Sequence, residues 1–153
     1  MITTMIKKED QNLMIQKATS GYTVCFANQC PQHELCLRWT VGQLMPSDVK
    51  DCQCVNPHFE EVATAHCPMF RPAEKTLWAK GMTRLFTDDM PQKVETGIRK
   101  ELMKRYNRTY FFEYRNGTRL IPPAMQEEIR AVCRQYGWKA DVQFDEYLEN
   151  YGW

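Results

Sequence analysis

Six of the seven cysteines lie in one segment, between Cys25 and Cys67, and only Cys133 stands apart. Thiolates are strong ligands for soft metal ions, and clustered cysteines in a reducing compartment favour metal ligation over disulfides. A total of seven also leaves one thiol unpaired in any disulfide scheme. The cluster therefore predicts loops that are held together by a metal ion.

Four of these cysteines are the expected ligands: Cys25, Cys30, Cys36 and Cys67. The interval Cys25-x4-Cys30 fits the usual spacing of paired zinc ligands, and the interval to Cys36 is slightly wider. Four thiolates in a tetrahedron describe a closed, structural zinc site. Cys30 and Cys67 are each followed by proline. Because a Cys-Pro pair also ends many iron–sulfur ligand runs, a [4Fe–4S] cluster on the same cysteines is the alternative cofactor.

Other side chains compete for a place in this site. Cys52 and Cys54 have one residue between them, an awkward spacing for a shared tetrahedron, so we rank them second. His33, His58 and His66 could each replace a thiolate. A set of free thiols without a metal is the remaining interpretation of the cluster.

Length and composition indicate an ordinary globular chain. The 153 residues match the usual size of one domain, and 43% hydrophobic with 25% charged residues is a typical mixture. No stretch approaches the roughly 20 apolar residues of a membrane span, and the start lacks a signal-peptide core. We therefore expect a location in the cytoplasm and no membrane partner.

The expected organisation is a flexible or loosely docked leader over residues 1–20, which allows a short helix around residues 9–17, followed by a single domain over residues 21–153. Residues 21–72 form the cysteine-rich metal-binding subregion, in which short helices are expected at 33–40 and after Asn56. Residues 73–153 form a more regular subregion with the order helix, helix, β-hairpin, helix. The predicted fold class is α+β and mostly helical, with one β-hairpin.

Apolar spacing predicts the helices of the second subregion. Residues 92–106 carry apolar side chains four residues apart, and the segment after Pro122-Pro123 repeats this pattern up to Gly137, a helix-ending residue. Two further segments have helical spacing: the residues around Leu77 and Leu85, and the closing segment 144–153. Between the two clear helices, residues 109–121 are aromatic and β-prone around Asn116-Gly117, which predicts a hairpin.

Basic residues gather in one part of an otherwise balanced chain. Residues 91–121 hold eight Lys or Arg and three Asp or Glu, whereas the net charge of the whole chain is +1. A helix pair followed by a hairpin is also the order of winged helix-turn-helix proteins, which bind nucleic acid. The residues expected to neutralise phosphates are Lys93, Lys100, Lys104, Arg115 and Arg119. A solvated helix face is the alternative explanation of these charges.

Signals for catalysis are few. The chain has no glycine-rich phosphate loop, nucleophile elbow or HExxH helix. A metal with three protein ligands and one open position would leave Glu34, Glu60 or Glu61 as a candidate general base. The sequence thus predicts a metal-stabilised, non-enzymatic domain that binds a protein or nucleic acid. An iron–sulfur or thiol redox protein and a metal-dependent hydrolase are the alternatives.

Several short strings resemble those of an uncharacterised bacterial family of small cysteine-containing proteins, classed as a domain of unknown function. They are Cys30-Pro31, Cys36-Leu37-Arg38, Cys67-Pro68, Gly117, Pro122 with Gln126, and Phe144-Asp145 with Tyr147. The resemblance covers residues 21–153 and implies bacterial origin and a single domain. It implies no activity, and it does not include Cys52 and Cys54, which agrees with their second rank.

Overall fold

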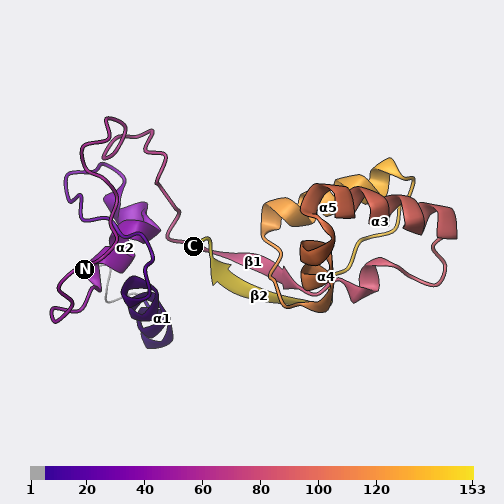
Figure 1. Cartoon of the computed structure of the whole chain (residues 1–153), viewed down its shortest axis with the longest axis horizontal. Helices are drawn as coiled ribbons and strands as arrows, with labels where there is room; N and C mark the ends of the chain where they lie inside the picture. The colour runs from indigo at the N-terminus through magenta and orange to yellow at the C-terminus, as the bar shows by residue number, and fades with distance from the viewer. Residues whose placement is uncertain (1–5) are drawn as a thin grey trace. The chain divides into compact units, whose positions relative to one another are not determined.

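The computed structural model describes residues 6–153 and shows an α+β, mostly helical fold, as predicted. The elements in chain order are α1 (Lys8–Thr19), η2 (His33–Leu35), α2 (Leu37–Gln43), β1 (Lys75–Lys80), η3 (Thr83–Leu85), α3 (Gln92–Tyr106), α4 (Arg108–Asn116), α5 (Pro123–Gln135) and β2 (Glu146–Tyr151) (Figure 1). The two strands form one antiparallel pair. Within residues 6–153, no helix has the length and apolar character needed to cross a membrane.

The chain divides into two compact units. Unit 1 runs to Glu74 and also takes in the last three residues, Tyr151–Trp153, whereas unit 2 is the continuous segment Lys75–Asn150. The chain therefore leaves unit 1 once and returns to it at the C-terminal end.

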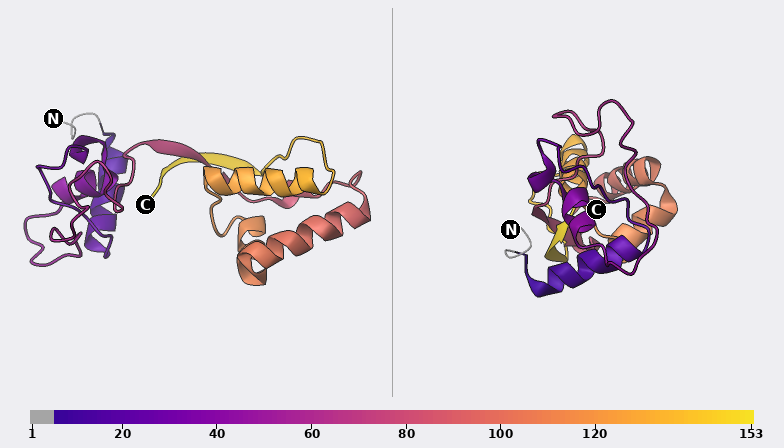
Figure 2. Two further views of the ribbon diagram at one scale, coloured as in Figure 1. Left: turned by 90° about the horizontal axis from the view of Figure 1, so that it is seen from above. Right: turned by 90° about the vertical axis from the view of Figure 1, so that its left-hand side faces the viewer.

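Unit 1 packs its two helices on a small apolar core, and most of its remaining chain is irregular (Figure 2). Met14 and Ala18 of α1 are buried against Val24, Leu37 and Val41. The short helix that the sequence allowed in the leader is α1, which buries one face, while residues 1–5 of the leader lie outside the described residues. The short helix expected at 33–40 is found as η2 and α2, but the segment after Asn56 forms turns in place of a helix.

Unit 2 is built around α3, which has the predicted bounds and buries Ile98 and Leu102. α3 packs against α4 and α5, and α5 packs against β1 (Figure 1). α5 begins at Pro123 as predicted, since proline fits the first helical position. Gly137 follows its end with a positive φ of 82°, and its amide bonds to the Arg134 carbonyl.

The predicted hairpin over residues 109–121 is wrong, because residues 108–116 form α4. Asn107 supplies the missing helix start: its side chain accepts a hydrogen bond from the Tyr110 amide at 3.0 Å. Gly117 ends the helix in the left-handed region, at φ 81°. An Asn-Gly pair suits a hairpin turn and a helix end equally, since both need the positive φ of glycine. Burial of Phe111 and Tyr114 on one helical face decides the outcome.

Two other helical predictions are also wrong. Residues 75–80 and 146–151, whose apolar spacing suggested helices, are β1 and β2 and pair with each other. Ile121 adds a bridge on β1, with two hydrogen bonds to Ala79 at 3.0 and 2.8 Å. Short apolar runs fit both the helical repeat and the two-residue repeat of a strand. The paired segments are also far apart in the chain, so local spacing could not reveal the pairing of β1 with β2.

Cys133 belongs to the core of unit 2. It is 1% exposed among Ile129, Val132 and Phe144. Burial raises the pKa of this thiol to about 11. The thiol therefore stays protonated near neutral pH and acts as a small apolar side chain, in agreement with its isolated place in the sequence.

Asp145 fixes the segment that follows β1. Its Oδ2 accepts from the Thr83 amide at 3.1 Å and the Thr83 hydroxyl at 2.8 Å, and its Oδ1 accepts from the Arg84 amide at 3.1 Å. Partial burial opposes ionisation, but these hydrogen bonds outweigh it and lower the pKa of the carboxyl group. The carboxylate thereby caps η3 from a residue close to β2 in the chain.

We expect Asp145→Asn to lower the free energy of unfolding at pH 7 by about 1 kcal/mol, because amide donors lose a charged acceptor. The folded-state pKa is depressed, so this stabilisation is present above the unfolded pKa of about 4 and is lost as the pH falls through the folded value. Urea unfolding at pH 7 and pH 3 measures the difference, which should shrink at pH 3. Asp141→Asn is the control, since Asp141 is exposed. Equal losses in the two variants at pH 7 would contradict the assignment.

Candidate metal site in unit 1

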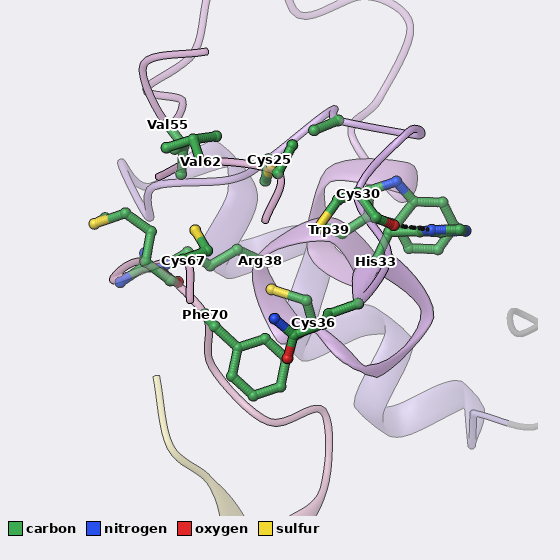
Figure 3. A pocket seen from close by; sticks show the side chains of 14 residues that line it. Cys25, Cys30, His33, Cys36, Arg38, Trp39, Val55, Val62, Cys67 and Phe70 are labelled. Carbon is green, nitrogen blue, oxygen red and sulfur yellow. Dashed lines mark hydrogen bonds between the residues drawn. The ribbon is translucent and has the colours of Figure 1, made fainter. Parts of the chain in front are cut away.

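Cys25, Cys30, Cys36 and Cys67 all line one pocket of unit 1 (Figure 3). Their side chains come from separate loop segments and surround a common space. The other walls are mainly apolar: Trp39, Val55, Val62, Met69 and Phe70. The cavity volume is about 20 Å³, room for a single water-sized sphere. The four thiols ranked first from the sequence are thus the ones that share a cavity.

The four thiols are close enough to affect one another electrostatically. Burial is the main cause of the raised pKa of Cys25, and the thiols of Cys36, Cys30 and Cys67 raise it further. Like charges disfavour ionisation when no cation is near. Without a cation, the pocket therefore favours the protonated form of the Cys25 thiol.

The side chains as placed do not form a coordination sphere. Across residues 6–153, no three His, Cys, Asp or Glu side chains are grouped closely enough to hold a metal ion. A cysteine side chain has a single χ1 torsion, with staggered positions that move the sulfur. A shared ion would therefore require some of these thiols to adopt other rotamers. The donor chemistry suits a soft metal ion.

Cys25 is held against α2 by the main chain. Its amide donates to the Arg38 carbonyl at 3.0 Å. Gly42 faces the same stretch, and a Cβ at this position would collide with the carbonyl oxygen of Cys25. Only glycine allows this close approach of helix and loop. The preceding residue, Val24, forms a parallel bridge with Cys54.

Cys30 and Cys36 flank a compact turn. The His33 amide donates to the Cys30 carbonyl at 3.2 Å, and the Cys36 amide donates to the His33 carbonyl at 3.1 Å. His33 Nδ1 also lies 2.7 Å from the Cys30 carbonyl oxygen, and its ring packs edge-on against Trp39 with centroids 4.6 Å apart. The imidazole thus points away from the four sulfurs and supports the Cys30 loop (Figure 3).

The Cys67 loop is joined to the same turn. Gln32 Nε2 donates to the Thr64 carbonyl at 3.0 Å. Cys36 forms an antiparallel bridge with Pro72, flanked by a bond from the Leu37 amide to the Arg71 carbonyl at 2.6 Å. Residues on both sides of Cys67 are therefore tied to the segment 32–37.

Arg38 connects the loops that carry Cys25 and Cys67. The residue is 8% exposed and also lines the pocket. Its Nη1 donates to the Thr23 carbonyl and its Nε to the Met69 carbonyl, each at 2.8 Å. Sequence reasoning missed this residue, because an arginine two positions after a cysteine carries no recognised signal for a buried bridge.

Of the competing ligands, His33 lines the four-thiol pocket, and the other four lie outside it. Cys52 and Cys54 are exposed, and neither lines the four-thiol pocket; Cys54 lines a neighbouring cavity together with Cys25. His58 and His66 are exposed and also absent from its walls.

The candidate general bases are not placed for catalysis at this pocket. Glu34, Glu60 and Glu61 are exposed, and none of them lines it. Glu34 lies 4.0 Å from His33 Nε2, on the outer side of the Cys30 turn.

The residues proposed for nucleic-acid binding have unequal surroundings. Lys93, Lys100 and Lys104 are exposed on α3. Arg119 is paired with Glu113 at 2.7 Å and lies over the Tyr110 ring, and Arg115 is half-buried in the last turn of α4. Because residues 108–116 are a helix, there is no wing at this place. Nucleic-acid binding through these residues stays a prediction.

A comparison with models of protein families identifies the family of this chain. A model described as a family of unknown function, DUF6078, matches residues 5–153. The chain belongs to this family. The predicted resemblance to a domain of unknown function is therefore confirmed, and the match extends over nearly all of both units of this DUF6078 protein. Separate comparisons with curated proteins and with solved structures found no match.

Gly42→Ala tests the approach of α2 to the Cys25 loop. We expect the free energy of unfolding to fall by about 1–3 kcal/mol, because the collision with main chain exceeds the roughly 1 kcal/mol that alanine gains in helix propensity. Chemical denaturation measures the change. Gly152→Ala in the same unit is the control, since a Cβ there meets nothing within 4 Å. A Gly42→Ala protein as stable as the wild type would show that this approach is not needed.

Proposed function

We propose that unit 1 binds one zinc ion through the thiolates of Cys25, Cys30, Cys36 and Cys67, and that the ion stabilises its loops. The observation that carries the proposal is the shared pocket, which these four thiols line although Cys67 is far from the other three in the chain. Zinc prefers four soft ligands in structural sites, and the cysteines offer such a set.

The irregular chain of unit 1 gives such an ion a role in folding. Between α2 and β1 the described chain forms turns and isolated bridges, and this stretch includes Cys67. Ordering such a segment costs conformational entropy that few apolar contacts repay. Binding of a metal by the folded state alone adds directly to the free energy of unfolding.

The surroundings of the Cys25 thiol support a bound metal centre in this pocket. The thiols of Cys36, Cys30 and Cys67 add to the raised pKa of Cys25, and a bound metal would stabilise the thiolate form that these neighbours disfavour. An iron–sulfur cluster on the same four thiols is the alternative occupant, and elemental analysis separates it from a single ion.

Four protein ligands would leave no open coordination position. A catalytic zinc keeps one position for water or substrate, so complete thiolate coordination supports a structural role. The positions of Glu34, Glu60 and Glu61 away from the pocket support the same conclusion. The proposed protein is therefore a metal-stabilised domain that acts by binding and does not catalyse a hydrolytic reaction at this site.

Purified full-length protein should contain about one zinc ion per chain by elemental analysis. We expect removal of the metal by a strong chelator to lower the melting temperature by about 10 °C or more, because a tightly bound ligand contributes several kcal/mol. Restoring one equivalent of zinc should restore the transition.

Single Cys→Ser variants locate the ligands. Changes at Cys25, Cys30, Cys36 or Cys67 should each reduce zinc content and melting temperature, whereas Cys52→Ser should change neither, since Cys52 is exposed outside the pocket. A melting curve unaffected by chelation, or zinc loss on Cys52→Ser alone, would contradict the proposal. If the purified protein is brown and contains iron and sulfide, the four thiols hold an iron–sulfur cluster and not zinc.

A further inference from the structure

Arg38 carries a buried positive charge that is hydrogen-bonded to neutral main-chain groups. The two hydrogen bonds of its guanidinium go to the carbonyls of Thr23 and Met69, and its Cζ lies 5.1 Å from the centre of the Tyr22 ring. Within residues 6–153, no carboxylate forms an ion pair with this side chain. A buried charge without an opposite charge is costly, and carbonyl hydrogen bonds compensate only part of that cost.

The position of Arg38 in its helix increases this cost. It is the second residue of α2, close to the end where the unpaired amides of a helix carry partial positive charge. A cation is unfavourable at this end. Neither this helix end nor an ion pair among residues 6–153 balances the charge of the guanidinium.

The four-thiol pocket is the place where negative charge can appear. Arg38 lines this pocket together with Cys25, Cys30, Cys36 and Cys67. Neutral thiols bring no charge to it. Four thiolates around one divalent ion would instead carry a double negative net charge, and a buried guanidinium at the wall would be opposite to it.

We propose that Arg38 is the counter-charge of an anionic tetrathiolate–metal complex in this pocket and favours complete coordination by all four cysteines. This inference rests on the proposed metal site and adds the charge of the bound species. Arg38 is a positioning residue here: it also ties the segments before Cys25 and after Cys67 to α2, so one side chain sets both the spacing and the charge balance of the site.

The experiment separates charge from hydrogen bonding. Arg38→Lys keeps the positive charge and can donate to one carbonyl, whereas Arg38→Gln keeps a donor but removes the charge. Arg71→Gln is the matched control, because Arg71 is a half-buried arginine that donates to the Phe70 carbonyl at 2.8 Å and does not line the pocket. The full chain is stripped of metal under reducing, oxygen-free conditions and titrated with Co²⁺ against a competing chelator.

Co²⁺ affinity and the thiolate-to-cobalt absorption are measured for each protein, and the melting temperature of the metal-free form is measured separately. We expect Arg38→Gln to weaken Co²⁺ binding by about 10- to 100-fold. Arg38→Lys should stay within a few-fold of the wild type, and Arg71→Gln should match it. The metal-free forms of both Arg38 variants should melt at similar, lower temperatures, since both lose one carbonyl bond.

Each other outcome has one meaning. Equal Co²⁺ affinities for Arg38→Gln and the wild type overturn the counter-charge. Equal losses in Arg38→Gln and Arg38→Lys also overturn it, because only the bridging geometry would then matter. If the wild type binds no Co²⁺ and no Zn²⁺, the proposed metal site itself fails, whatever the variants do.

Discussion

The pocket of unit 1 depends on the bridge made by Arg38. Its guanidinium bonds the carbonyl of Thr23, two residues before Cys25, and the carbonyl of Met69, two residues after Cys67. A strand ladder usually sets such distances in a domain, but here isolated bridges and one buried side chain perform this task. The guanidinium is suited to it because its donors point in fixed directions. The placement of thiols that are distant in the chain therefore follows from the buried polar contacts of one short helix.

Local signals in the sequence were sufficient where one face of a helix is continuous. The regular apolar spacing of α3 and the prolines and glycine that bound α5 gave these helices their correct places. Local signals failed where the same residues are compatible with two different secondary structures. Asn116-Gly117 ends α4, although the same pair closes hairpins, and the cap formed by Asn107 was not recognised. β1 and β2 were missed because each strand is defined by a partner that lies far along the chain.

The candidate metal site was also only partly predictable from the sequence. Spacing and the following prolines singled out four thiols from seven, and those four line one pocket, while their binding of a metal stays a prediction. What spacing could not supply is the wall of that pocket. Trp39 and Phe70 close it from different segments, and the close approach at Gly42 depends on how α2 packs. These features arise from tertiary contacts, which leave no periodic trace in the sequence.

The division of the chain has a topological consequence for how such a protein can vary. Unit 2 is one uninterrupted segment, and its two ends lie in β1 and β2, which pair with each other in opposite directions. A segment whose ends are neighbours behaves as an inserted cassette, since it can be lengthened, shortened or exchanged while the host keeps its chain order. The cysteines that line the pocket all lie outside that cassette. The three-helix part can thus diverge without altering the order of the thiols.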